Sequence, residues 1–298
     1  MTANILIINT NPLLNLVHRD HFEPGTINRV PSMEIHAEGK GVNVGRVLAR
    51  LGHSAILTGF AGGHSGAWLR DLIRAEGIED DFVETAAPIR VGFMASSPLD
   101  QHPTTVLPNG FPVTRDECGL LLKRVRERLD QVQLVIISGS VPDPMADSLY
   151  ADILELCQQA AMPCWLDAHG LALTQALETG LPVALAKPNR EEYAQSCHWN
   201  QVKELHITDG EGPIEVQSLK QGNWRVIPPD IRQVNPVGSG DCYLAGLAHG
   251  YLLGWPMHQR LVFASAAGAA NALENDVAMI RPDDIQSLMA QVNVTHLD

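Results

Sequence analysis

The chain has 298 residues, of which 45% are hydrophobic and 18% are charged, which excludes an intrinsically disordered protein because disorder requires low hydrophobicity and high charge. Its 21 lysines and arginines against 34 aspartates and glutamates give a net charge of −13, which argues against non-specific binding to nucleic acid. Small anionic substrates remain compatible with this charge, because a local cationic pocket can overcome the field of the whole protein.

The cysteines predict reduced thiols in a cytoplasmic protein. Their number is odd and no C-x-x-C pair occurs, so neither a disulfide framework nor a zinc site is indicated. The cysteines are Cys118, Cys157, Cys164, Cys197 and Cys242. The opening segment, MTANILIINTNP, lacks the basic and long apolar regions of a signal peptide. No segment approaches about 18 uninterrupted apolar residues, so we expect no membrane span.

Apolar runs that predict strands alternate along the chain with segments of helical period. In chain order the pattern predicts a strand at 4–9, a helix at 42–51, a strand at 54–60, helices at 65–75 and 115–129, a strand at 134–138, a helix at 145–160, strands at 164–167 and 183–186, a short helix from Asn189, strands at 204–208, 214–218 and 225–227, and helices near 239–253, 257–273 and 282–292. Strands separated by helices form βαβ units, so we expect an α/β fold with a mostly parallel sheet and helices on both faces. Such sheets bind ligands at the carboxyl ends of their strands.

Two stretches, 11–36 and 88–106, do not follow this alternation. They are richer in proline, threonine and short β-like runs, and we expect them to form a small sheet that stands off the main body. No linker divides the chain, so residues 1–298 are predicted to form a single domain.

The strongest motif is a glycine-rich turn at 235–241, Asn-Pro-Val-Gly-Ser-Gly-Asp, that opens directly into an apolar helix. Gly238 and Gly240 let the backbone adopt conformations closed to residues with a Cβ, and successive N–H groups at a helix N-terminus form an anion site. A carboxylate beside such a site, Asp241, suits proton abstraction from a hydroxyl while the N–H groups stabilise the charge of a phosphoryl group. The pattern is also compatible with an ordinary helix start capped by Ser239 or Asp241.

A second glycine-rich turn, Glu-Gly-Lys-Gly-Val-Asn at 38–43, also leads into a helix. It is not a phosphate-binding Walker loop, because that loop requires Ser or Thr after the lysine. One interpretation is a tight turn with close helix packing. The other places Gly39, Lys40 and Gly41 under a polar substrate, with Asn43 hydrogen-bonded to it. No G-x-G-x-x-G follows the first strand, so a dinucleotide site is not expected.

The two glycine motifs and an ordered set of shorter pieces resemble the ribokinase-like (PfkB) carbohydrate kinases, over nearly the whole chain. The similarity is greatest to the branch that contains fructose-1-phosphate kinase, tagatose-6-phosphate kinase and the minor phosphofructokinase. The matching pieces are Asn11-Pro12, Asn28-Arg29, residues 39–44 and 46–48, Gly62-Gly63, residues 138–142, Asp167, residues 187–189, Glu192 and residues 235–241.

This resemblance implies a three-layer α/β/α body with a small β lid, and transfer of the ATP γ-phosphoryl group to a sugar hydroxyl with Mg²⁺. It further implies a homodimer formed through the lid. By position, Asp241 is the catalytic base, and the anion hole consists of Gly238, Ser239 and Gly240. The implied substrate-binding residues are Asn15, Arg29, Gly39, Lys40, Gly41, Asn43, Arg90 and Ser140, with Arg29, Arg90 and Ser140 on the substrate phosphate. The implied nucleotide-binding residues are Lys187, Asn189, Glu192, Thr208 and Gly210, with Glu192 holding the metal through water.

Four departures from the family pattern support an alternative, a catalytically impaired relative that binds a sugar phosphate or nucleotide as a regulator. Glu38 replaces the usual glycine, Asn15 replaces the usual aspartate, Pro213 stiffens the nucleotide turn, and the segment 193–205 is short. A third possibility is a kinase for an unphosphorylated sugar. Arg29 and Arg90 argue against it, because a guanidinium suits a phosphate dianion.

Overall fold

A computed structural model describes residues 4–95, 104–196 and 198–297, and its main body is built on one 10-stranded sheet. In spatial order the strands of this sheet are β14 (Asn293–Leu297), β13 (Gly222–Ile227), β12 (Ile214–Ser218), β11 (Glu204–Ile207), β10 (Leu185–Ala186), β9 (Cys164–Asp167), β8 (Leu134–Ser138), β1 (Asn4–Asn9), β4 (Ser54–Gly59) and β5 (Glu79–Asp80). The strands from β11 to β5 pair in parallel, whereas β11 to β14 form an antiparallel extension. The predicted mostly parallel sheet is confirmed.

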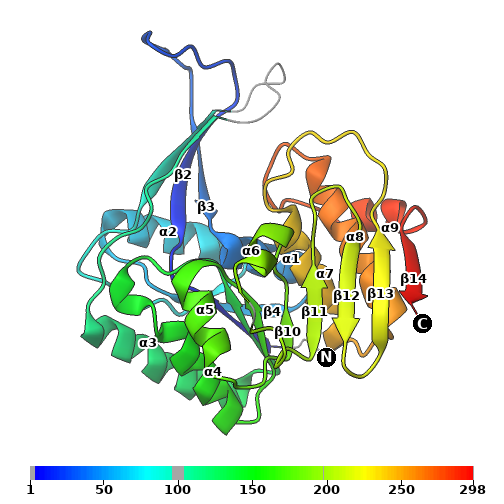
Figure 1. Cartoon of the computed structure of the whole chain (residues 1–298). Coiled ribbons are helices and arrows are strands. Elements are labelled where there is room, and N and C mark those ends of the chain that lie inside the picture. The colour runs from blue at the N-terminus through cyan, green and yellow to red at the C-terminus, as the bar shows by residue number, and fades with distance from the viewer. Residues whose placement is uncertain (1–3, 96–103, 197, 298) are drawn as a thin grey trace.

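Helices cover both faces of this sheet (Figure 1). They are α1 (Lys40–Arg50), α2 (Gly63–Ala75), α3 (Arg115–Arg128), α4 (Leu149–Gln159), α5 (Gly170–Glu178), α6 (Arg190–Ala194), α7 (Ser239–Leu252), α8 (Met257–Ala272) and α9 (Pro282–Met289), with 3-10 turns at Leu129–Gln131 and Pro144–Ala146. Helices α3, α4 and α5 lie on one face, and α1, α7 and α8 pack together on the other. No helix in the described part of the chain is both long and apolar enough to cross a membrane.

Strand β1 lies in the core between β8 and β4, and it is the third strand from the β5 edge of the sheet. Its residues Ile5, Leu6, Ile7 and Ile8 are all fully buried, as expected for a parallel strand covered on both faces. Burial of each of these four side chains stabilises the folded state by about 1.5–3 kcal/mol relative to leaving it exposed to water. The carboxyl end of β1 is therefore a rigid platform for the polar residues that follow it.

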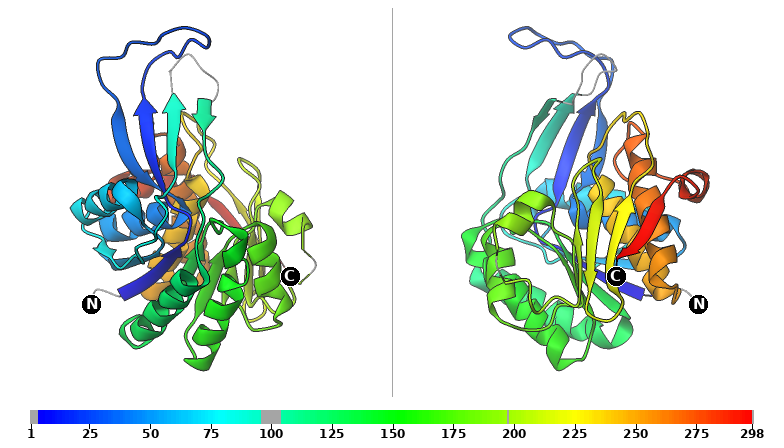
Figure 2. Two further views of the ribbon diagram at one scale, coloured as in Figure 1. Left: turned by 90° about the vertical axis from the view of Figure 1, so that its left-hand side faces the viewer. Right: turned by 45° about the vertical axis from the view of Figure 1, so that its right-hand side comes forward.

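The lid is a separate 4-stranded sheet that projects from the body (Figure 2). Its strands in spatial order are β3 (Glu34–Glu38), β2 (Leu13–His18), β6 (Val91–Ala95) and β7 (Thr104–Val106). The two stretches that broke the helical alternation thus form the predicted lid. The part of the second stretch at 96–103 lies outside the described residues.

Four elements differ from the sequence prediction. The helix predicted at 145–160 is a 3-10 turn at Pro144–Ala146, capped by the side chain of Asp143, followed by α4 from Leu149. Helix α5 and strands β5 and β14 were not predicted. The remaining helices and strands occur where expected, with shifts of a few residues at their ends.

Four cysteines in the described part of the chain, Cys118, Cys157, Cys164 and Cys242, are free thiols, as predicted. Cys197 lies outside the described residues.

Candidate active site

The turn at 235–241 places the N-terminus of α7 against the carboxyl ends of the central strands. Gly238 adopts a left-handed conformation with φ 83° and is the residue that caps α7, without any side-chain cap. A Cβ at this position would lie 2.5 Å from Val277 Cγ1, so only glycine is accommodated. At the start of α7 the N–H of Ser239 donates to the carbonyl of Pro236 at 3.1 Å and that of Asp241 to the carbonyl of Gly238 at 3.0 Å. The N–H groups of Gly238 and Gly240 have no acceptor among the described residues and are available to an anion.

Asp241 does not cap the helix, which contradicts the interpretation of this turn as an ordinary helix start. Its Oδ2 accepts a hydrogen bond of 2.8 Å from Nδ2 of Asn43 in α1, and only 6% of the residue is exposed. Burial and the nearby charge of Asp167 raise the pKa of Asp241 to about 6, against the opposing effect of Lys40 and Lys187. A carboxylate with this pKa is charged at neutral pH and is a better proton acceptor than an exposed aspartate.

Ser239, at the start of α7, is not a cap either. Its Oγ accepts a hydrogen bond of 3.1 Å from Nδ2 of Asn271 in α8. The same Nδ2 donates to the carbonyl of Val237 at 2.8 Å, and the Asn271 Oδ1 accepts from the N–H of Ala278 at 2.7 Å. Asn271, which is fully buried, therefore holds the turn before α7 in place.

Two lysines from distant parts of the sequence converge on one carboxylate. Lys40 Nζ and Lys187 Nζ lie 3.2 Å and 3.3 Å from Oδ1 of Asp167, at the end of β9. Lys40 Nζ is also 3.7 Å from Oε1 of Glu192. Burial alone would lower the pKa of Lys40, but the carboxylates of Asp167, Asp241 and Glu192 raise it instead. Lys40 is therefore cationic, and Lys187 lies beside the first turn of α7, where an ideal Cβ on Gly240 would be 3.2 Å from Lys187 Nζ.

The glycines of the second motif allow close packing as well as access to the site. Cβ atoms on Gly39 and Gly41 would lie 2.9 Å and 2.6 Å from side-chain atoms of Asn9, at the end of β1. Asn9 Oδ1 accepts the N–H of Gly41 at 3.1 Å, which fixes the turn that carries Lys40. The packing and substrate interpretations of this motif are therefore compatible.

A buried arginine supports the part of α1 that carries Asn43. Arg46, 1% exposed, pairs with Glu76 and donates from Nη1 to Oδ1 of Asn43 at 3.4 Å. This contact orients the amide of Asn43 so that its Nδ2 faces Asp241. Arg46 also donates to the carbonyl of Ala37 in lid strand β3 at 2.7 Å, so it links the lid to this network.

The structure places the residues predicted for the substrate phosphate in three different settings. Arg90 is tied to the backbone, donating to the carbonyls of Asn11 and Pro108 at 2.9 Å each and more weakly to that of Pro12. Ser140 Oγ accepts from Asn11 Nδ2 at 3.0 Å, so Ser140 and Arg90 are linked through one residue. Arg29 lies exposed in the loop between β2 and β3 and is not brought to this group.

Asn15 and Glu38 lie on the same side of the lid sheet, since Asn15 pairs with His36 and Leu13 with Glu38. Asn15 is 1% exposed and its Oδ1 has no hydrogen-bond partner among the described residues. Burial raises the pKa of Glu38, although the Asn15 side chain opposes this shift. Asn15 and Glu38, two of the four departures from the family pattern, therefore interact with each other.

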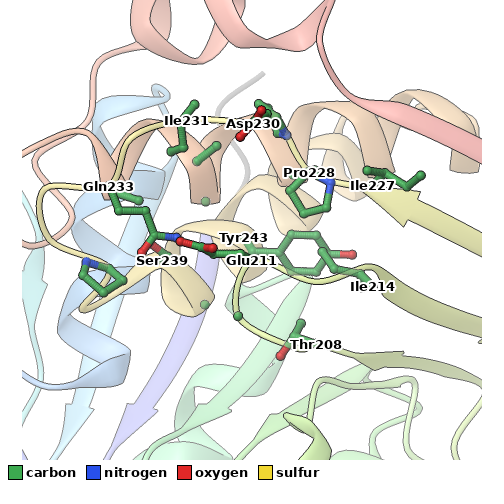
Figure 3. A pocket seen from close by; sticks show the side chains of 18 residues that line it. Thr208, Glu211, Ile214, Ile227, Pro228, Asp230, Ile231, Gln233, Ser239 and Tyr243 are labelled. Atoms are coloured by element: carbon green, nitrogen blue, oxygen red, sulfur yellow. The ribbon is translucent and has the colours of Figure 1, made fainter.

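Two of the five residues predicted to bind a nucleotide, Thr208 and Gly210, line a cavity of about 590 Å³ between α7, α8 and strands β12 and β13 (Figure 3), whereas Lys187, Asn189 and Glu192 do not line it. Thr208 and Gly210 line it together with Ser239 and Gly240, so the cavity opens onto the N-terminus of α7. Its further walls are mainly apolar and include Ile214, Ile227, Pro228, Ala269 and Ala272. This volume and lining are typical of a small-molecule site.

Asn189 and Glu192 form a capping box at the start of α6, which the sequence did not predict. Asn189 Oδ1 accepts the N–H of Glu192, and Glu192 Oε2 accepts the N–H of Asn189, both at 2.8 Å. The other carboxylate oxygen of Glu192, Oε1, is the one near Lys40. No helix follows in the described residues between α6 and β11, in agreement with the short segment noted in the sequence.

Sequence reasoning assigned no role to Asp167, although the structure makes it the partner of both lysines. Asp167 is the last residue of an otherwise apolar strand, and this position places a polar side chain at the carboxyl edge of a parallel sheet. Asn9 ends β1 in the same way and was also missed as a support of the glycine turn.

Comparisons with known proteins agree with this arrangement. The family model of pfkB family carbohydrate kinases matches residues 7–282. A tagatose-6-phosphate kinase from Staphylococcus epidermidis is 28% identical over 308 residues, covering 97% of this chain and 99% of that protein.

Solved structures share the fold over nearly the whole length of the chain. Phosphofructokinase-2 from Escherichia coli in complex with potassium has a TM-score of 0.87 at 22% identity, covering 97% of this chain and 99% of that one. A possible 1-phosphofructokinase from Thermotoga maritima has a TM-score of 0.89 at 20% identity, covering 99% and 100%.

Proposed function

Because the chain belongs to the pfkB family of carbohydrate kinases, we propose that it transfers the γ-phosphoryl group of ATP to a hydroxyl of a ketose phosphate, giving a sugar bisphosphate. Fructose-1-phosphate, fructose-6-phosphate and tagatose-6-phosphate are the candidate acceptors. The observation that carries the proposal is the buried Asp241 carboxylate, set in the first turn of α7 beside Lys40 and Lys187.

Each part of this group has a role in phosphoryl transfer. Asp241 accepts the proton of the attacking hydroxyl, while Asn43 holds the carboxylate in place. In the predicted anion hole of Gly238, Ser239 and Gly240, the N–H groups of Gly238 and Gly240 stabilise charge on the transferred group, whereas that of Ser239 donates to the carbonyl of Pro236. Lys40 and Lys187 neutralise phosphate charge, and in this kind of reaction positioning and charge stabilisation supply most of the catalysis. This complete set of groups favours turnover over the alternative of a non-catalytic regulator.

A phosphorylated acceptor is supported by Arg90 and by the relatives. Arg90 uses its guanidinium on three backbone carbonyls at the base of the lid, and a guanidinium has five donors, so two of its N–H groups have no acceptor among the described residues and can serve a phosphate. Two similar proteins from Staphylococcus epidermidis are tagatose-6-phosphate kinases. For Arg29 to reach the same phosphate, the loop between β2 and β3 would have to bend toward the body.

For the nucleotide, we assign the base and ribose to the apolar cavity and the phosphates to its opening at Ser239 and Gly240. Mg²⁺ fits as an ion that keeps its water shell, because one oxygen of Glu192 caps α6 and the other lies 3.7 Å from Lys40 Nζ, which leaves neither free for direct ligation. Asp167 Oδ2, buried and without a partner among the described residues, is a further acceptor in the same group. Glu192 would hold Mg²⁺ through water, and the ion would neutralise phosphate charge.

A homodimer formed through the lid is the proposed assembly. Apolar side chains stand exposed on and beside the outer strands of the lid, with Val91 41%, Val106 62% and Leu107 48% exposed. Strand β7 is the last strand of its sheet, so its edge is available for pairing with a second copy. Sedimentation velocity of the parent and of Val106→Glu tests this assembly, and a monomeric parent would refute it.

A turnover assay against a panel of acceptors tests the proposed function. ADP release from ATP and Mg²⁺ is measured with the three ketose phosphates and with unphosphorylated fructose and tagatose. We expect activity with at least one ketose phosphate and little with the free sugars. Activity with free sugars alone would refute the phosphosugar assignment. Binding of a ketose phosphate without ADP release would support the non-catalytic alternative.

A further inference from the structure

A buried chain of four polar side chains lies behind the proposed nucleotide cavity. His206 of β11 is at its centre, with Nδ1 2.8 Å from the hydroxyl of Tyr243 in α7 and Nε2 2.9 Å from Oε1 of Glu204. Arg260 of α8 completes the chain, with Nη2 2.9 Å from Oε2 of Glu204. His206 is fully buried, and Tyr243 and Arg260 are 3% and 4% exposed. The chain therefore connects β11 to α7 and α8, the two helices that border the cavity.

The hydrogen positions in this chain follow from its chemistry. Burial raises the pKa of Glu204, but the hydrogen bond from His206 and the charge and hydrogen bond of Arg260 outweigh burial and lower this pKa, so the carboxylate is ionised and can only accept. Nε2 of His206 must then carry a hydrogen. Burial lowers the pKa of His206, so the ring is neutral and its Nδ1 is an acceptor. The hydroxyl of Tyr243 consequently donates to His206, and this bond fixes where the end of the tyrosine ring lies.

Tyr243 itself lines the cavity and lies in the helix turn that carries the catalytic group (Figure 3). It is two residues after Asp241, and α8 approaches this turn closely at Gly268, where a Cβ would lie 3.1 Å from the carbonyl oxygen of Ser239 and 3.6 Å from Tyr243 Cβ. A small change in the tilt of Tyr243 would therefore change the wall of the cavity. Ser265, whose buried Oγ has no partner among the described residues, lines the same cavity.

The cost of burying this chain argues that it does more than stabilise the fold. Buried ion pairs are often no more stabilising than apolar side chains of similar volume, since removing charges from water offsets their attraction. A fully hydrogen-bonded buried network does, however, hold its members in one arrangement. The member with a surface on the cavity is Tyr243.

We propose that His206 is a positioning residue for nucleotide binding, which it supports by holding Tyr243 as a wall of the cavity. This inference rests on the proposed nucleotide site. It assigns to Glu204 and Arg260 the role of fixing the tautomer and the ring of His206. It predicts that removing the bond between His206 and Tyr243 weakens nucleotide binding while leaving sugar phosphate binding unchanged.

Calorimetric titration with adenosine 5′-(β,γ-imido)triphosphate and Mg²⁺ tests the inference without requiring turnover. Tyr243→Phe removes one oxygen and leaves the ring, and we expect its nucleotide Kd to rise by roughly 3- to 10-fold. His206→Leu should raise the nucleotide Kd by a similar factor. The double variant, His206→Leu with Tyr243→Phe, should have a Kd no higher than that of the single variant with the higher Kd. His206→Asn, whose amide can still accept from the tyrosine, should lie between His206→Leu and the parent.

Tyr150→Phe is the matched control, because Tyr150 is also fully buried and its hydroxyl bonds to Thr10 and the carbonyl of Gly139, away from the cavity. It should lower stability and leave nucleotide Kd within about twofold of the parent. An unchanged nucleotide Kd in Tyr243→Phe, or an equal rise in Kd in Tyr150→Phe, would overturn this inference and leave the proposed function standing. A parent that binds no nucleotide would overturn the proposed function and this inference with it. Should His206→Leu not fold, Tyr243→Phe still decides.

Discussion

Replacing Asp167 by asparagine should move the acid limb of the pH–rate profile to lower pH. Asp241 must be ionised to accept a proton, and its pKa is about 6, so kcat/KM of the parent should fall by half near that pH. The charge of Asp167 is one cause of the raised pKa, second to burial. Asparagine removes this charge and releases Lys40 and Lys187, which both favour the ionised form of Asp241.

The expected shift is large enough to measure. Removing a nearby like charge changes a pKa by about one unit or more, which is about 1.4 kcal/mol per unit. At pH 5, the parent should retain about 10% of its plateau kcat/KM, whereas Asp167→Asn should retain about 50% of its own plateau. Lys40→Met should shift the midpoint the other way, because Lys40 lowers the pKa of Asp241.

The assay is kcat/KM for the ketose phosphate from pH 4.5 to 8, each variant normalised to its plateau. The substrate phosphate also ionises near pH 6, so the parent midpoint alone does not identify Asp241. Asp81→Asn is the matched control: Asp81 is 9% exposed and also pairs with two cations, Arg124 and Arg128, beside edge strand β5. If the midpoint of the acid limb is the same in the parent and in all variants, this limb does not report the ionisation of Asp241 and the reasoning is refuted.

Three further substitutions have separate readouts. Arg90→Ala should raise KM for the sugar phosphate by about 10- to 100-fold and that for ATP far less, in steady-state kinetics with each substrate varied; equal changes in both would remove Arg90 from the phosphate site. Glu192→Gln keeps an acceptor for the N–H of Asn189 but loses the charge, so it should raise the Mg²⁺ concentration for half-maximal rate; unchanged Mg²⁺ dependence with lower stability would make Glu192 structural. Burial, and to a lesser degree His53, lowers the pKa of His249 to about 4, so its contribution to stability is present above about pH 6.5 and is lost as the pH falls toward 4. His249→Gln should therefore flatten the dependence of the unfolding free energy on pH in that window, as measured by urea denaturation. An unchanged slope would contradict the lowered pKa of His249 as its cause.

The sequence predicted the elements of the body well because their signals are local. The apolar run of β1 and the glycine turn before α7 each specify their structure within about ten residues. The helix predicted at 145–160 begins later because Pro144 and the Asp143 cap close a separate 3-10 turn. Helix α5 could have been found from Leu173, Ala176 and Leu177, which are buried on one face.

Strand β14 had no comparable signal. It is mostly exposed and polar, and it exists because Asn293–Leu297 pairs with the edge strand β13. Such pairing depends on tertiary position more than on local preference.

The candidate site was predicted in its parts and not in its connections. The roles of Asp241 and the glycine turns depend on local motifs, which the sequence contains. The convergence of Lys40 and Lys187 on Asp167 joins residues 127 and 20 positions apart, and it depends on the order of strands in the sheet. The same holds for the bond from His206 to Tyr243, which no spacing rule predicts.

The kcat of Asp241→Asn tests the central claim most directly. Asparagine keeps the shape of the side chain but is a far weaker base, so kcat should fall by at least about 100-fold. Binding of the nucleotide analogue should stay within a few-fold of the parent. Because the pKa of Asp241 is raised in the fold, its charge lowers stability above about pH 6, so the variant should be at least as stable as the parent at pH 8. A folded variant whose kcat stays within a few-fold of the parent would contradict the account.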